Sequence, residues 1–252
     1  MEILSSRLTA LEKPVERHAP PGPPVVQVQA SDPEEQQHSQ GASCQAVPMP
    51  STGSRAGAVR VLICGHSIVF WARKRAASSS FGTQLQLGSL ATVHWVARRG
   101  MLWDQLLPAF YEFVHAHAPP HIIVIHLGEN DLGQRTTLSL RLQACSDILH
   151  ISQCFRGMVI LWSDLLPRRV WRYASNVKKI ELARKKVNSY VRRAVLRHGG
   201  GVISHPGISY DVPQLFRSDG VHLSVFGNDV FLRDLQQGLR KFLSVWGGGA
   251  KR

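Results

Sequence analysis

Short apolar runs and longer amphipathic segments alternate along the chain from about residue 58 onward. The short runs are rich in Val, Ile and Leu, which predicts buried strands at 59–64, 91–97, 121–127, 157–162 and 200–205. The longer segments carry apolar residues three or four positions apart, which predicts helices at 68–77, 103–117, 136–152, 175–198 and 224–246. Strands that alternate with helices predict one three-layer α/β domain, over 58–247, with a parallel sheet covered on both faces.

The two ends of the chain differ in composition from this domain. Residues 1–57 are rich in Pro, Gln, Ser and Gly and poor in aromatic residues, so we predict a disordered tail that buries too little apolar area to become ordered. Residues 248–252 form a short basic tail. The N-terminus lacks a basic segment followed by an apolar core, and no run approaches the roughly 20 apolar residues of a membrane span. We therefore expect an intracellular protein, cytoplasmic or nuclear.

Ligands of an open parallel α/β sheet bind where the strands end, so the residues that follow each predicted strand are candidates for a site. Gly65, His66 and Ser67 follow the first run. A serine at the start of the next helix would expose its hydroxyl beside free backbone N–H groups, although it would equally serve as a helix cap. Gly100 follows the second run, where it either brings an N–H close to a ligand or makes a turn.

Polar residues also follow the third run and precede the last helix. The third run ends in Gly128, Glu129, Asn130 and Asp131, and the amide of Asn130 would suit an oxyanion, although an Asx turn also explains the polar residues. The segment before the last helix has the spacing Asp-x-x-His at 219–222. A carboxylate at this spacing can orient an imidazole and stabilise its protonated form, although the pattern also occurs by chance.

In this order, GHS at 65–67, Gly100, GEND at 128–131 and DGVH at 219–222 resemble the four motifs of the SGNH hydrolases, also called GDSL-type esterases or lipases. The resemblance spans about 60–245. There is also a looser likeness to hydrolase domains carried by some vertebrate retroelements, whose first motif can read GHSIVFWA. The resemblance implies a flavodoxin-like fold with a five-stranded sheet. It also implies a serine esterase or deacetylase that cleaves a small acyl ester and needs neither a cofactor nor a metal.

The resemblance also implies a role for each motif residue. Ser67 would be the nucleophile, His222 the base that takes its proton, and Asp219 the acid that orients His222. The oxyanion would be held by the backbone N–H groups of Ser67 and Gly100 and by the side chain of Asn130. No GxSxG elbow occurs in the chain, which disfavours the alternative of an α/β-hydrolase fold.

His66 is the position where this chain departs from the family pattern. The family usually has Asp there, and that carboxylate helps to organise the loops around the site. We do not expect His66 to be the base for Ser67, because adjacent side chains on a strand or tight turn diverge.

A second hypothesis rests on charge. The formal net charge of +13 favours polyanionic partners, and much of the basic charge lies between residues 156 and 199. Such a run is usually just a solvated face. The alternative function is a catalytically weak SGNH-fold module that binds nucleic acid or a protein partner through this basic helix. The candidate nucleic-acid contacts are Lys178, Lys179, Arg184, Lys185, Lys186, Arg192 and Arg193.

Other features carry less information. The segment HAHAPPH at 115–121 has no acidic or Cys partner beside it, and the four cysteines lack zinc-type spacing, so we expect no metal site. His126 lies within the third run and is expected to be a core histidine. No feature of the loops 81–90 and 163–174 identifies a substrate, although the arginines of the loop 163–174 would favour an anionic one.

Overall fold

Five parallel strands form the central sheet, as the hydrophobic pattern predicts. Their order across the sheet is β2-β1-β3-β4-β5, the flavodoxin-like order. In the computed structural model, the described residues are 58–248, and the predicted tails at 1–57 and 249–252 lie outside them. The strands are β1 (Val59–Gly65), β2 (Ala91–Ala97), β3 (Ile122–His126), β4 (Val159–Ser163) and β5 (Gly201–Ile203).

The five predicted helices are also present. They are α1 (Ser67–Ala77), α2 (Leu106–Ala116), α3 (Thr137–Cys154), α4 (Val177–Arg197) and α5 (Val225–Gly248). The helix predicted over 103–117 begins instead with a short 3₁₀ turn, Trp103–Gln105, and becomes α-helical at Leu106. Pro108 then falls in the first turn of α2, where its missing N–H costs no helical hydrogen bond. Within residues 58–248, no helix combines the length and the apolar character that a membrane crossing needs.

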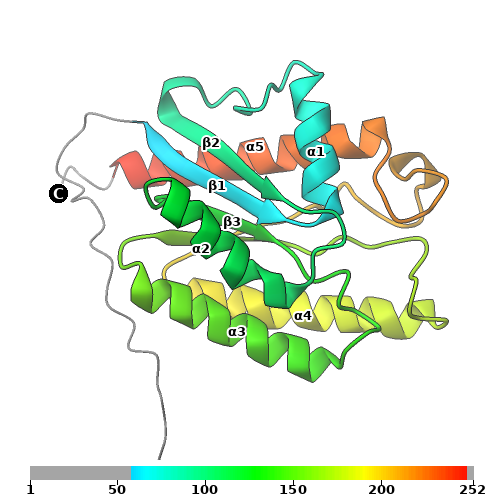
Figure 1. The fold of residues 1–252 in the computed structure, drawn as a ribbon. Helices are drawn as coiled ribbons and strands as arrows, with labels where there is room; N and C mark the ends of the chain where they lie inside the picture. Colours follow the sequence, from blue (N-terminus) through cyan, green and yellow to red (C-terminus); the bar gives the residue numbers. More distant parts are fainter. Residues whose placement is uncertain (1–57, 249–252) are drawn as a thin grey trace, which may run out of the picture. The chain divides into compact units, whose positions relative to one another are not determined.

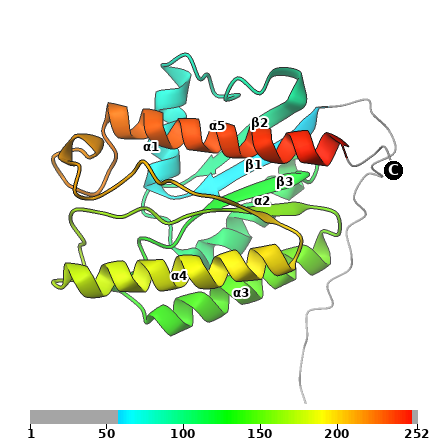
Figure 2. The ribbon, with the colours of Figure 1, turned by 180° about the vertical axis from the view of Figure 1, so that it is seen from behind.

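Helices cover both faces of the sheet. Helices α1 and α5 lie on one face, and α2, α3 and α4 lie on the other (Figures 1 and 2). Side chains of β1 alternate between the two layers, with Val61 and Ile63 in the cluster under α1 and α5 and Leu62 and Cys64 in the opposite cluster. Burial on both faces explains why the strands are continuous apolar runs.

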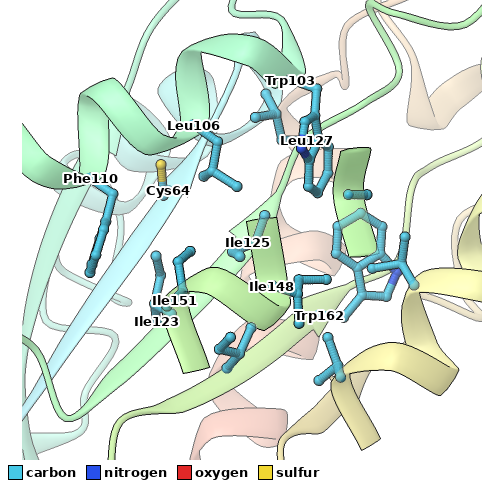
Figure 3. Close-up of a cluster of buried hydrophobic side chains, with 14 of the residues drawn as sticks. Cys64, Trp103, Leu106, Phe110, Ile123, Ile125, Leu127, Ile148, Ile151 and Trp162 are labelled. Carbon is cyan, nitrogen blue, oxygen red and sulfur yellow. The ribbon is translucent and has the colours of Figure 1, made fainter. Parts of the chain in front are cut away.

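The larger of the two clusters packs side chains from β1, β3 and β4 against α2 and α3 (Figure 3). Two buried tryptophans, Trp103 and Trp162, lie with ring centroids 6.0 Å apart. Each indole N–H has a buried acceptor, since Trp103 donates to Asp147 at 2.9 Å and Trp162 donates to Asn188 at 3.3 Å. These bonds join the 3₁₀ turn after β2 to α3, and β4 to α4.

The chain reverses its direction across the sheet at β1 and β3, which are neighbours although β2 lies between them in sequence. In this fold class a crevice opens at such a reversal, at the carboxyl ends of the strands. Gly65 lies opposite His126 there, and a Cβ at residue 65 would lie only 2.2 Å from the His126 carbonyl oxygen. Glycine at position 65 therefore lets the loops after β1 and β3 approach each other.

Candidate active site

Ser67 is the first residue of α1, and His66 is the helix cap. The backbone N–H of Ile68 donates to His66 Nδ1 at 3.2 Å. The alternative that Ser67 caps this helix is therefore wrong. Because N–H groups in a first helical turn have no partner within the helix, the N–H of Ser67 is available to a ligand. The Ser67 residue is only 6% exposed, at the edge of a pocket.

The structure brings Ser67, His222 and Asp219 together from the two ends of the domain. His222 Nε2 lies 3.1 Å from Ser67 Oγ, and His222 Nδ1 lies 2.7 Å from Asp219 Oδ2. The backbone N–H groups of Val221 and His222 both donate to Asp219 Oδ1 at 2.9 Å. Partial burial works against ionisation, but these bonds lower the pKa of Asp219. An ionised Asp219 accepts the Nδ1 proton of His222 and leaves Nε2 free to accept one from Ser67.

Gly100 and Asn130 line the same pocket as Ser67. Gly100 has a φ of +76°, a conformation that favours glycine, and its N–H donates to none of the described residues. Asn130 Oδ1 accepts from Arg168 Nη2 at 3.0 Å, and Asn130 Nδ2 donates to the Met101 carbonyl at 3.1 Å. Since arginine can only donate, these contacts fix the orientation of the amide, and one N–H of Nδ2 remains for a ligand.

The pocket at the strand ends has a volume of about 600 Å³, which suits a small ligand. Its walls come from the loops after β1, β2, β3 and β4 and from the segment before α5. The lining combines apolar side chains with three arginines. The residues are Ser67, Arg99, Gly100, Leu102, Glu129, Asn130, Leu132, Gln134, Arg168, Trp171, Arg172, Tyr173, Asp219, Val221 and His222.

His66 points away from Ser67 and forms a buried pair with Glu129. His66 Nε2 lies 2.6 Å from Glu129 Oε2, and both side chains are fully buried. Because His66 Nδ1 accepts from Ile68 N–H, the proton of the neutral ring is on Nε2 and is donated to Glu129. Burial lowers the pKa of His66 from 6.5 to about 4, despite the opposing effect of Glu129. His66 is therefore neutral, with no lone pair left for the Ser67 hydroxyl.

Glu129 holds three elements together. Its Oε1 accepts from the backbone N–H of Leu166 at 2.9 Å, in the loop after β4, and lies 3.0 Å from His126 Nε2 in a bent contact. Burial by itself would raise the pKa of Glu129, but His126 and His66 hold it well below its usual range. An ionised Glu129 thus joins the loops that follow β1, β3 and β4.

A buried polar chain continues from Glu129 past the carboxyl ends of β3, β4 and β5 to α5. His126 Nδ1 lies 3.0 Å from Ser163 Oγ, Ser163 Oγ lies 2.8 Å from His205 Nε2, and His205 Nδ1 lies 3.0 Å from Asp234 Oδ2. Burial lowers the pKa of His205, against the opposing effect of Asp234, and so favours the neutral ring of His205. The chain therefore connects β3, β4 and β5 to α5 through buried polar side chains.

A ligand nitrogen of His66, a ligand nitrogen of His126 and a carboxylate oxygen of Glu129 lie within 4.8 Å of one another. Two histidines and a carboxylate at this spacing are a donor set that transition metals accept. Here the same atoms contact one another, so the hydrogen bond between His66 and Glu129 and the contact between His126 and Glu129 account for the cluster. His126 is the buried core histidine that the sequence predicts.

The basic helix is α4, and its seven candidate contacts fall into two groups. Arg184 and Arg192 bind within the protein, because Arg184 pairs with Glu181 and donates to the Leu165 carbonyl, while Arg192 pairs with Asp164. Arg184 therefore does not belong to an outer contact surface. The exposed members are Lys178, Lys179, Lys185, Lys186 and Arg193.

Nothing in the amino-acid sequence singles out Glu129 or the buried chain beyond it. Glu129 occupies the variable position of the GEND motif, and its partner His66 is the departure from the family pattern. The only available signal was that two unusual residues follow β1 and β3, which are neighbouring strands.

The fold is that of the GDSL-like lipases and acylhydrolases. A GDSL-like lipase from Bacteroides thetaiotaomicron matches with a TM-score of 0.57 and 16% identity, over 72% of this chain and 88% of that chain. A putative acylhydrolase from Bacteroides fragilis matches with a TM-score of 0.57 and 17% identity, over 80% and 93% of the two chains.

The esterase EstA from a Pseudoalteromonas species, in a structure inhibited by monoethylphosphonate, has a TM-score of 0.54 and 12% identity, over 73% of this chain and 98% of that chain. No family model and no curated protein sequence matches this chain. Structural matches at such low sequence identity establish the fold alone. The reaction has to be inferred from the chemistry of the site.

Proposed function

We propose that this protein is a serine hydrolase that cleaves, or transfers, the acyl group of a small ester. The observation that carries the proposal is the linked contact of Ser67 Oγ with His222 Nε2 at 3.1 Å and of His222 Nδ1 with Asp219 at 2.7 Å. A nucleophile, a base and an orienting acid in this arrangement are what acyl transfer requires. Ser67, Gly100 and Asn130 line the same pocket and carry N–H groups that bind none of the described residues, which supports the proposal.

The reaction would follow two steps. Ser67 Oγ attacks the ester carbonyl while His222 Nε2 takes the hydroxyl proton, and the oxyanion is stabilised by N–H groups of Ser67, Gly100 and Asn130. The C–O bond of the ester then breaks, and the alcohol leaves with the proton from His222. Water next attacks the acyl-enzyme, giving a proton to His222, and the carboxylic acid leaves as Ser67 regains its proton.

The test is covalent labelling of Ser67 by a fluorophosphonate, together with hydrolysis of p-nitrophenyl acetate. We expect Ser67→Ala and His222→Ala to abolish both signals with little change in the thermal unfolding temperature. Ser218→Ala and His115→Ala are matched controls, since both residues are exposed and make no recorded side-chain contact among the described residues. If the unaltered protein neither labels at Ser67 nor releases p-nitrophenol, the proposal is wrong.

A second candidate function rests on the outer face of α4. Lys178, Lys179, Lys185 and Lys186 are exposed, and their one- and seven-residue spacings put them on one side of the helix. Such a stripe suits the phosphate backbone of a nucleic acid. Retention of labelled RNA should fall steeply with salt and weaken in a Lys185→Gln, Lys186→Gln double variant. RNA retention that does not change with salt concentration, or that is unchanged in the double variant, would exclude this function.

A further inference from the structure

Arg168 is a buried arginine at the candidate active site without a carboxylate partner. The residue is only 7% exposed, and its one recorded hydrogen bond runs from Nη2 to Asn130 Oδ1 at 3.0 Å. Its Nε is buried without a partner, and no ion pair joins Arg168 to an Asp or Glu of the described residues. Its contact with Trp171, at 5.3 Å from the ring centroid, offsets only part of the lost hydration.

The Nη1 group of Arg168 is available to a ligand. Its Nη1 donates to none of the described residues and is not buried, and Arg168 lines the pocket that contains Ser67. A buried charge without a partner destabilises a folded protein, so a site that keeps one is suited to a ligand of opposite charge. The guanidinium group matches carboxylate and phosphate oxygens in geometry as well as in charge.

Two further arginines line the same pocket. Arg99 and Arg172 are exposed, and neither side chain has a recorded partner within residues 58–248. The three arginines of the lining outnumber its two acidic residues, Glu129 and Asp219, so the net charge of the pocket is positive. Both carboxylates are already bound within the protein, Glu129 to His66 and Asp219 to His222.

We propose that the ester substrate carries an anionic group, a carboxylate or a phosphate, which Arg168 and Arg172 bind next to the scissile carbonyl. This inference rests on the proposed hydrolase function. Arg168 contacts Asn130, the expected oxyanion donor, so the anion lies beside the reacting carbonyl rather than at the pocket mouth. Arg172 is the exposed neighbour that helps to draw the anion in, and Arg168 also orients the Asn130 amide.

The experiment compares pairs of esters that differ in one charge, at constant ionic strength. The first pair is the p-nitrophenyl monoester of glutaric acid and its methyl ester, which places the carboxylate on the acyl side. The second pair is monoacetylglycerol phosphate and monoacetylglycerol, which places the charge on the alcohol side. We expect kcat/KM for the anionic member of at least one pair to exceed that of its neutral partner by about tenfold to hundredfold. The pair that shows the preference identifies the side on which the anion lies.

Three variants locate the preference. Arg172→Gln should reduce the anionic-to-neutral ratio of kcat/KM toward one. Arg168→Gln should reduce the same ratio and also lower the rate on both esters, because Asn130 loses its partner. Arg169→Gln is the matched control, because Arg169 is the next residue of the loop and carries the same charge but does not line the pocket. Its ratio should equal that of the unaltered protein.

The outcomes separate this inference from the proposed function. If Ser67 labels and neutral esters are cleaved, but no anionic ester is preferred or the ratio survives Arg168→Gln and Arg172→Gln, the anionic substrate is wrong and the hydrolase stands. If no ester is cleaved and Ser67 does not label, the hydrolase is wrong. In that case, calorimetry would measure the binding of inorganic phosphate and of monomethyl glutarate to the Ser67→Ala protein. These measurements test whether the anion site exists. Saturable binding that Arg172→Gln removes and Arg169→Gln retains supports the site, and any other result overturns it.

Discussion

Two histidine–carboxylate pairs flank Ser67, and they differ in burial and in the use of their ring nitrogens. In the pair of His222 and Asp219, the contact is 2.7 Å and the side chains are 27% and 46% exposed. In the pair of His66 and Glu129, the contact is 2.6 Å and both side chains are fully buried. The residue types and the distances are nearly the same in both pairs.

The pairs differ in whether the histidine keeps a ring nitrogen free for Ser67. His222 uses Nδ1 for its carboxylate and leaves Nε2 3.1 Å from Ser67 Oγ. His66 uses both nitrogens, one to cap α1 and one to bind Glu129. The first pair is therefore suited to exchange a proton with Ser67, whereas the second holds the loop that presents Ser67. Proximity in sequence is a poor guide to such a role, because it does not fix which atoms face each other.

The largest expected effect separates the pairs by activity. Asp219→Asn should lower kcat for p-nitrophenyl acetate by about 10⁴-fold, because His222 loses the partner that sets its tautomer, with a stability change below about 1 kcal/mol. His66→Asn should leave Ser67 reactive toward a fluorophosphonate, because Asn can also cap a helix. Steady-state kinetics and urea unfolding measure both effects. Loss of Ser67 labelling in a folded His66→Asn protein would contradict the conclusion that His66 is not required for the reactivity of Ser67.

The next effect separates the pairs by stability. Glu129→Ala should destabilise the fold by about 3–5 kcal/mol, because it leaves the buried N–H groups of His66 and Leu166 without their acceptor. Glu112→Ala is the matched control, since Glu112 pairs with Arg98 at the surface and its side chain is 69% exposed. This control should cost less than about 1 kcal/mol in urea unfolding. Equal losses in the two variants would contradict the structural role of the buried Glu129 carboxylate.

A third prediction concerns pH. The pKa of His66 is about 4 in the fold against an ordinary value of 6.5, so between these values the unfolded chain binds a proton that the folded protein does not. The contribution of His66 to stability is full above pH 6.5 and falls as the pH drops toward 4, by about 3 kcal/mol. His66→Asn should flatten this dependence in urea unfolding at several pH values, and the exposed His115→Asn should not. An unchanged slope in His66→Asn would show that His66 is not the group responsible.

The smallest effect is the coupling between the two partners of the buried pair. His66→Asp restores the residue that the family usually has but places two carboxylates in one buried site, so it should be destabilising. Adding Glu129→Gln supplies a donor to the new carboxylate and should recover part of the loss. The double-mutant cycle should give a coupling of about 1–3 kcal/mol. Additive losses would mean that the two positions do not depend on each other.

The fold was predictable to a large extent because each local pattern agrees with the tertiary structure. All five strands and five helices form within a few residues of their predicted positions, and Ser224 receives the N–H of Gly227 at 3.0 Å in the first turn of α5, as a helix cap does. Both faces of the sheet are buried, so the strands are nearly uniform apolar runs. In the amphipathic helices, apolar residues spaced three or four positions apart indicate the buried face.

The candidate site was predictable only in part. Ser67, Gly100, Asn130, Asp219 and His222 follow strands or precede a helix, and a parallel sheet gathers such positions at one edge. The contacts of Glu129 and Arg168 were not predictable, because a side chain after a strand can face the pocket, the core or the solvent.

By itself, the sequence determined the order of the elements, the parallel sheet and the short set of residues at its carboxyl edge, because these follow from local periodicity and the rules of strand connection. The tertiary structure decided which histidine faces Ser67, since that depends on where His66 and His222 find their carboxylates, 63 positions and three positions away along the chain. It also decided that Arg168 is buried without a carboxylate partner beside the reacting groups. Burial and the direction of a hydrogen bond are properties of packed neighbours, and no single segment of the chain carries them.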